Sequence, residues 1–198
     1  DHEQNCSSTA MRGVGSSAVD PYSAAAAAIG ALYGPLHGGA NEQVLRMLDR
    51  IGTVENIPDF LEGVKNRKEK LMGFGHRVYR AEDPRARVLR ATARRLDAPR
   101  YEAAAALEQA ALAELRERRP DRAIETNVEF WAAVILDFAE VPPAMMPAMF
   151  TCGRTAGWCA HILEQKRLGK LVRPAALYIG PGPRDPASVA GWDEISHT

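Results

Sequence analysis

The 198-residue chain carries 25 lysines and arginines against 25 aspartates and glutamates, and 46% of its residues are hydrophobic. This composition supports a folded apolar core and excludes a global positive field that would attract nucleic acid or an anionic membrane surface. The most apolar runs, 24–32 and 130–138, are shorter than the roughly 20 residues that a bilayer span requires, so we expect no membrane segment.

Taken in chain order, nearly all predicted elements are helices. Asp20 and Pro21 predict a helix start and a helix over 21–33, and an apolar stripe at helical spacing predicts a second over 41–51. Further helices are expected over 58–71, 84–97, 101–119, 128–140 and about 142–167, bounded by caps, prolines and glycines. The best strand candidate is 176–180, and an irregular tail follows Pro174. The predicted fold class is therefore all-α.

His37 lies in the stretch "GPLHGGAN", just before a predicted helix. The positive end of a helix dipole disfavours imidazolium, so a neutral ring that donates one hydrogen bond is plausible, and Gly38 and Gly39 would let a substrate come close. The alternative is that His37 simply fills a turn.

His76 lies in a second glycine turn, "MGFGHRVYR", with Arg77, Arg80 and Arg85 downstream. Backbone amides of such a turn and guanidinium groups together suit phosphate or carboxylate, although a solvated basic face would look the same. The upstream run "KNRKEK" has no interleaved aromatics, so we interpret it as a solvated helix face rather than a nucleic-acid patch.

Glu129 and Arg154 are charged residues within apolar surroundings. Glu129 stands in the first turn of an apolar helix, where desolvation raises a carboxyl pKa and the positive end of the helix lowers it. A general base can use such a pKa. A plain charge at the helix N-terminus fits the sequence equally. Arg154 interrupts "MFTCGRTAGWCAH" and needs an anionic partner if buried. His161 and Glu164 lack a further metal ligand, so we expect a surface or interface pair.

Cys6, Cys152 and Cys159 have neither metal-ligand spacing nor the pattern of a disulfide framework. A reducing, cytoplasmic location is the natural expectation. The chain also begins at "DHEQNC" as though in mid-sequence, which suggests a fragment of a longer protein.

Together, "DHEQN", "GPLHGGANEQV", "MGFGHRVYR" with "DPRA", "TNVEF" and "RTAGWCAH" resemble the carboxyl-terminal half of bacterial citrate synthases, in the family's order and approximate spacing. The resemblance implies a multi-helical fold in which 1–39 belongs to the large domain, 40–140 forms the small, coenzyme A-binding domain, and 141–198 returns to the large domain and ends in a tail. It also implies a homodimer or higher homo-oligomer that needs the missing amino-terminal half.

The resemblance also assigns roles to individual residues. His37 would hydrogen-bond the thioester oxygen of acetyl-CoA while Glu129 removes a methyl proton, and His76 would protonate the ketone oxygen of oxaloacetate. Residues matching oxaloacetate-binding positions are His2, Arg85 and Arg154, with Arg173 lent across the dimer, and residues matching coenzyme A contacts are Met72, Gly73, Phe74, Gly75 and Arg80. No metal or cofactor is called for.

One departure from the family pattern concerns Glu129, which stands where aspartate is common. Its extra methylene shifts the carboxylate by more than about an ångström, and displacements of that size lower rates. Two alternatives remain open at this stage: a 2-methylcitrate synthase that uses propionyl-CoA, and a non-catalytic fragment that oligomerises or binds coenzyme A.

Overall fold

The computed structural model describes residues 4–192, and within them the chain is all-α as predicted. The only bridge between extended segments there is an isolated antiparallel pair, Phe74 with Thr126. The helices are α1 (Cys6–Gly15), α2 (Pro21–Tyr33), α3 (Ala40–Ile51), α4 (Ile57–Lys65), α5 (Pro84–Arg95), α6 (Tyr101–Arg118), α7 (Val128–Phe138) and α8 (Met146–Leu168), with short 3-10 turns η1 (Val54–Asn56), η2 (Pro143–Met145) and η3 (Pro186–Ser188).

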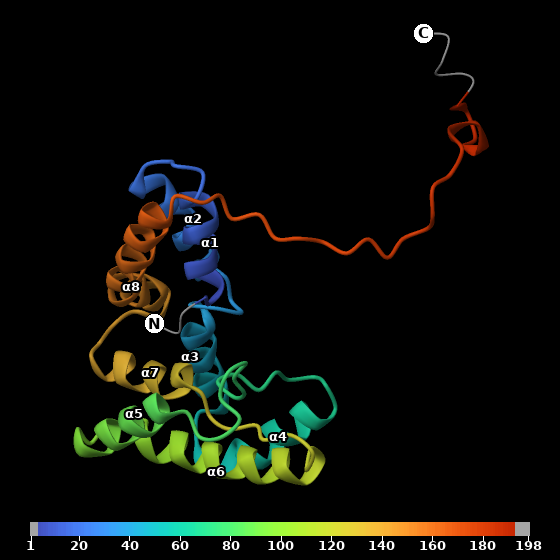
Figure 1. The fold of residues 1–198 in the computed structure, drawn as a ribbon. Helices are drawn as coiled ribbons and strands as arrows, with labels where there is room; N and C mark the ends of the chain where they lie inside the picture. The colour runs from blue at the N-terminus through green and yellow to red at the C-terminus, as the bar shows by residue number, and fades with distance from the viewer. Residues whose placement is uncertain (1–3, 193–198) are drawn as a thin grey trace.

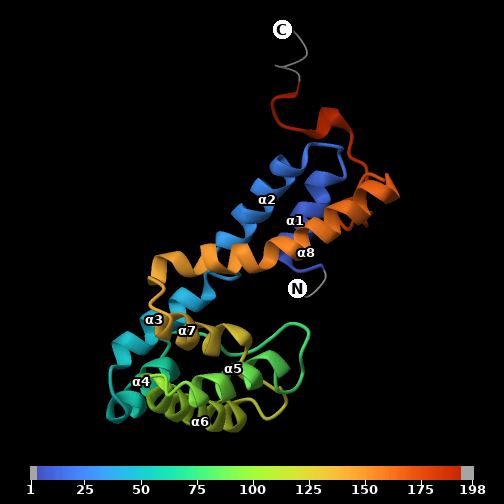
Figure 2. The same cartoon turned by 90° about the vertical axis from the view of Figure 1, so that its left-hand side faces the viewer.

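The helices form two groups, each around its own apolar cluster (Figure 1). Helices α1, α2 and α8 enclose the smaller cluster: Met11, Ala24, Ala28, Leu32, Trp158 and Ile162. Helices α3 to α7 enclose the larger one, to which α3 contributes Val44, Leu45, Met47, Leu48 and Ile51 along one stripe. Each such aliphatic side chain stabilises the fold by about 1.5–3 kcal/mol when fully buried. The view turned by 90° shows α8 beginning near α3 and α7 and running away from them along the upper group (Figure 2).

Sequence signals account for several helix ends. Asp20 caps α2 by accepting from the amides of Tyr22 and Ser23, and Asn127 caps α7 by accepting from the amide of Glu129. Gly169 ends α8 in the left-handed conformation, with φ of 62°. These boundaries confirm the predictions based on caps and glycines.

One helix prediction had a wrong end, and one helix was not predicted. Helix α4 ends at Lys65 rather than near 71, because the amides of Lys68 and Glu69 both donate to the carbonyl of Gly63 and turn the chain. Helix α1 was not expected, although Asn5 caps it by accepting from the amide of Ser8.

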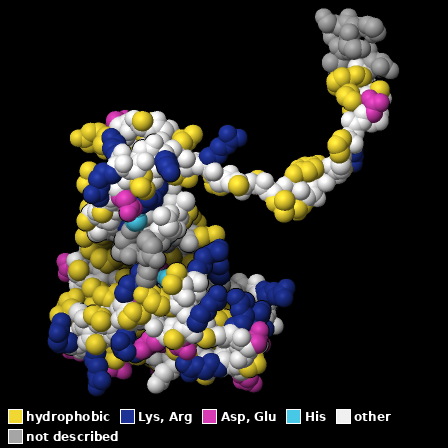
Figure 3. Space-filling view, in the orientation of Figure 1, with side chains coloured by type: hydrophobic (Ala, Val, Ile, Leu, Met, Phe, Trp, Pro, Cys, Tyr) yellow, Lys and Arg dark blue, Asp and Glu magenta, His cyan; other side chains and the backbone are white. Residues whose placement is uncertain are grey.

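The tail after α8 is extended, and 176–180 forms no strand. Its exposed apolar side chains, yellow in the space-filling view, follow one another away from the body (Figure 3). They include Leu171, Val172, Leu177, Tyr178 and Ile179. No helix between residues 4 and 192 is long and apolar enough to cross a bilayer. The division at 39 and 140 stays a prediction.

Candidate active site

The first part of the site forms where the start of α1 meets His37 and α8. The backbone amide of Ser7 lies 3.3 Å from His37 Nε2 and donates to it, so in the neutral ring the proton is on Nδ1. Burial lowers the pKa of His37 below its ordinary value, and the positive charge of Arg154 lowers it further. The structure therefore favours a neutral His37 whose Nδ1–H is a hydrogen-bond donor.

Arg154 reaches this end of α1 from the middle of α8. It is only 7% exposed, and its Nη1 donates to Asn5 Oδ1 at 2.9 Å and to Ser7 Oγ at 3.2 Å. Its guanidinium also covers the ring of Phe150, 4.8 Å from the centroid. The buried arginine that the sequence indicated is thus held in place by the cap of α1.

Gly38 has a packing role that the sequence did not reveal. A Cβ at this position would lie 2.7 Å from both the side chain and the carbonyl oxygen of Leu32. The glycine is therefore required for close packing of the His37 turn on the end of α2, and its role in the approach of a substrate stays a prediction.

The second part of the site is the turn that carries His76. The amides of Val78 and Tyr79 donate to His76 Nδ1 at 3.0 and 3.1 Å, so in the neutral ring the proton lies on Nε2. Nη2 of Arg85 lies 3.3 Å from that Nε2. Since both atoms then carry protons, the pair presents two donors side by side, an arrangement that suits the oxygen of a carbonyl or carboxylate.

Asp83 fixes the orientation of Arg85. Its carboxylate is 1% exposed and accepts from the backbone amide, Nε and Nη2 of Arg85 at 2.9, 3.0 and 2.8 Å. These hydrogen bonds and the charges of Arg85 and His76 hold the pKa of Asp83 below its ordinary value, although burial, the largest single effect, acts in the opposite direction. The side chain is therefore a buried anion that positions a cation.

Glu129 joins the two parts. Burial raises its pKa to about 7, while the charges of Arg85 and Arg154 act to lower it. The same carboxyl group thus lies within electrostatic range of arginines from α5 and α8. A carboxyl group with a pKa near neutrality suits a general base.

A short backbone strap holds the His76 turn against the start of α7. The amide of Gly75 donates to the carbonyl of Glu125 at 2.7 Å, and the amide of Asn127 donates to the carbonyl of Gly73 at 2.9 Å. The side chain of Asn127 adds a third bond, from Nδ2 to the carbonyl of Gly75 at 3.0 Å. The strap fixes the position of His76 relative to Glu129.

Gly73 cannot be replaced easily within this strap. Its φ is +86°, and a Cβ would lie 2.8 Å from Cβ of Phe130. The ring of the adjacent Phe74 packs edge-on against the ring of Phe130, with centroids 5.3 Å apart. The glycine pattern around His76 therefore results from backbone geometry and close packing against α7.

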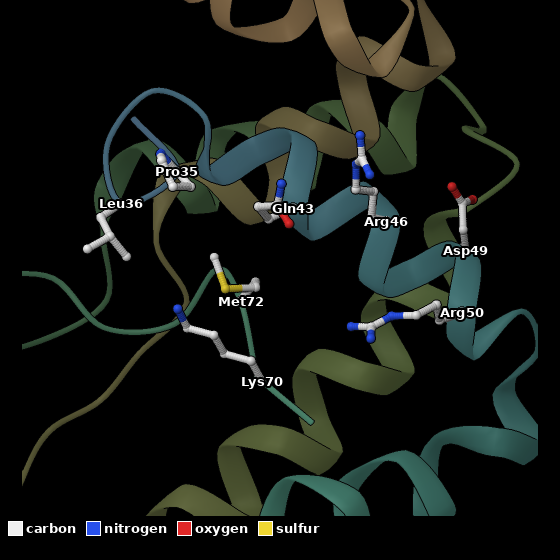
Figure 4. Close-up of a pocket in the computed structure, with 8 residues that line it drawn as sticks. All are labelled: Pro35, Leu36, Gln43, Arg46, Asp49, Arg50, Lys70 and Met72. Carbon is white, nitrogen blue, oxygen red and sulfur yellow. The ribbon is translucent and has the colours of Figure 1, made fainter. Parts of the chain in front are cut away.

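A surface pocket of about 540 Å³ opens beside the turns of both histidines (Figure 4). Leu36, which precedes His37, and Met72, which precedes Gly73, line it together with Pro35, Gln43, Arg46, Asp49, Arg50 and Lys70. Two arginines and a lysine next to apolar walls suit a ligand with both phosphate and apolar parts. Only Met72 among these residues had been identified from the sequence.

Other predicted site residues lie outside this arrangement. His2 is outside the described residues, and Arg80 is exposed. The amide of Val172 donates to Ser16 Oγ, which places the exposed Arg173 at the opposite end of α1 from the Asn5 cap. Their roles stay predictions.

His161 and Glu164 both contact Arg12, which makes them a polar link between α8 and α1. No group of three or more potential metal-ligating residues occurs within the described part of the chain. The expectation that no cofactor is needed remains a prediction.

Comparison with known proteins identifies the family. The family model for the citrate synthase C-terminal domain matches residues 1–175. The chain belongs to the citrate synthase family. It is 67% identical, over all 198 residues, to a Mycobacterium tuberculosis protein provisionally named citrate synthase 2, of which it spans 53%. It is 48% identical over 187 residues to the glyoxysomal citrate synthase of Cucurbita maxima, covering 91% of this chain and 36% of that protein.

Solved citrate synthases share the fold. The citrate synthase of Thermoplasma acidophilum, solved as a ternary complex with carboxymethyl coenzyme A and oxaloacetate, aligns with a TM-score of 0.82 and 34% identity, covering 93% of this chain and 50% of that chain. The enzyme of Thermotoga maritima gives 0.79 and 34%, with coverages of 93% and 51%. The chain thus spans about half the length of the relatives that it matches.

Proposed function

We propose that this chain supplies the catalytic groups of a citrate synthase, which condenses acetyl-CoA with oxaloacetate and hydrolyses the product to citrate and coenzyme A. The observation that carries the proposal is the convergence of a neutral His37, the His76–Arg85 donor pair and Glu129 with its pKa near 7. Family membership and the bound compounds named for the Thermoplasma acidophilum enzyme support the same reaction.

In the first step, the carboxylate of Glu129 takes a proton from the methyl group of acetyl-CoA. Negative charge then moves to the thioester oxygen, where Nδ1–H of His37 donates a hydrogen bond. The amide of Ser7 holds the ring in the tautomer that this donation needs. A fixed donor aimed at developing charge lowers the barrier because it needs no reorganisation during the reaction.

In the second step, the methyl carbon attacks the ketone carbon of oxaloacetate, and the proton on Nε2 of His76 moves to the ketone oxygen. Arg85 and Arg154 bind carboxylates of the substrate. Asp83 and Asn5 already orient these two arginines, so little side-chain freedom is lost on binding. Water then cleaves the thioester and releases coenzyme A.

The pocket beside Leu36 and Met72 is our candidate for the coenzyme A site, with Arg46, Arg50 and Lys70 facing its phosphates. We also propose that the active protein is a homodimer or larger homo-oligomer completed by an amino-terminal half. Its cytoplasmic location is supported by three cysteines that are all free.

The test is oxaloacetate-dependent thiol release from acetyl-CoA and from propionyl-CoA, with the chain content verified by intact mass. Release supports a condensing enzyme, and the ratio of the two rates distinguishes citrate synthase from 2-methylcitrate synthase. Glu129→Gln should lower turnover at least about 100-fold, the scale of general-base catalysis, while Glu117→Gln on the exposed face of α6 should not. Absence of release from folded protein that includes the amino-terminal half contradicts the proposal and favours a non-catalytic role.

A further inference from the structure

A second pocket, outside the proposed active site, lies along α5 and the start of α6. Its volume is about 490 Å³, and its lining consists of Arg87, Arg90, Ala91, Arg94, Arg95 and Tyr101. Helix α5 carries five arginines and no acidic residue. Arg85 is directed to Asp83 in the active site, so the remaining four arginines all line this pocket.

One of the four arginines is fixed rigidly. Arg90 donates from Nη1 to Glu108 at 3.0 Å and from Nη2 to Glu82 at 2.7 Å. Glu108 is only 5% exposed and also accepts from Nε1 of Trp131 at 2.9 Å. The side of the pocket formed by Arg90 is therefore preorganised by α6 and α7.

The other arginines leave positive charge unneutralised. Arg87 reaches Glu82 only at 3.9 Å, and no ion pair joins Arg94 or Arg95 to any residue in the described range 4–192. A helix dipole accounts for cations in the last turn, where Arg94 and Arg95 lie, but it disfavours Arg87 near the N-terminus. Four guanidinium groups thus face two carboxylates around one pocket.

The shape of the pocket points to a small ligand. Ala91, an exposed residue of α5 next to Arg90, adds only a methyl group to the lining, and the ring of Tyr101, which also lines the pocket, packs against Trp131 with centroids 5.6 Å apart. Guanidinium groups bind phosphate oxygens in bidentate fashion, so several of them around one pocket favour linked phosphates over a single carboxylate. We propose that this pocket binds a small molecule through a diphosphate or triphosphate group.

The test is calorimetric titration of the full chain with pyrophosphate and with tripolyphosphate at constant ionic strength. We expect saturable binding that weakens at least tenfold in the Arg94→Gln/Arg95→Gln variant and also in Ala91→Leu, which fills the pocket without removing charge. Circular dichroism checks that both variants are folded. Nucleoside diphosphates and triphosphates, titrated next, show whether a base against Tyr101 adds affinity.

Two matched controls each remove two positive charges elsewhere. Arg118→Gln/Arg119→Gln lies on the exposed end of α6, and Arg46→Gln/Arg50→Gln lies in the proposed coenzyme A pocket. The α6 control should bind pyrophosphate as the unaltered chain does, and Arg46→Gln/Arg50→Gln should keep the binding that Arg94→Gln/Arg95→Gln loses. Absence of binding, equal weakening in the α6 control, or weakening confined to Arg46→Gln/Arg50→Gln would overturn the proposal. Because the readout is binding, the result is independent of turnover.

Discussion

Replacement of Asn127 by alanine should destabilise the protein measurably, because this side chain makes two separate hydrogen bonds. Its Oδ1 accepts from the amide of Glu129 at 3.1 Å, and its Nδ2 donates to the carbonyl of Gly75 at 3.0 Å. Loss of a helix cap costs about 1 kcal/mol, and loss of a part-buried side-chain hydrogen bond costs about 1 kcal/mol more. The free energy of unfolding should therefore fall by about 2 kcal/mol.

Asn127→Ser separates the two contributions, since serine caps helices but is too short to replace the bond to Gly75. It should lose about 1 kcal/mol, half of the alanine effect. Urea unfolding followed by the fluorescence of the buried Trp131 and Trp158 measures both variants, and the melting temperature of the alanine variant should fall by about 4–8 °C. A loss below about 0.5 kcal/mol for Asn127→Ala, or equal losses for both variants, would refute this reasoning.

Three further substitutions test the electrostatics and packing of the site. Because burial raises the pKa of Glu129 from 4.5 to about 7, the unfolded chain loses this proton at lower pH than the folded protein, and the free energy of unfolding falls as pH rises between these values. Glu129→Gln should therefore raise the free energy of unfolding by on the order of 3 kcal/mol at pH 8 and change it little at pH 4.5. Equal effects at both pH values in urea titrations would contradict this. Gly73→Ala forces a side chain to φ of +86° against Phe130 and should cost at least about 2 kcal/mol, whereas Gly13→Ala, with open space around it, should gain about 0.5–1 kcal/mol in the same assay. Ser7→Ala removes an acceptor shared by Arg154 and Trp158 and should cost about 1–3 kcal/mol in thermal unfolding; an unchanged melting curve would argue against these bonds.

Local signals in the sequence predicted most of the fold. Helices α2, α3 and α7 were found because their caps and apolar spacing are properties of neighbouring residues. Helix α1 was missed although Asn5 stands at its start, because its apolar stripe is weak and its stability comes from packing on α2 and α8. The predicted end of α4 was wrong because a turn around Gly63 outweighed helical propensity.

The candidate site was predictable only in part. Histidines, arginines and the acid could be singled out as unusual in their local context, and the family resemblance supplied their roles. The groups that hold them, Ser7 beneath His37 and Asp83 behind Arg85, act across contacts that local patterns do not reveal. Asp83 caps α5, and its burial against Arg85 became apparent only from the structure.

The strap between residues 73–75 and 125–127 also has a consequence for folding order. It closes a loop of about 50 residues that contains all of α5 and α6, and closing a flexible loop of that length costs on the order of 3–4 kcal/mol of chain entropy. Few contacts within the strap can offset that cost before α5 and α6 have packed on α7. His76 and Glu129 should therefore come together late during refolding, and the recovery of any activity should lag behind the recovery of helical circular dichroism.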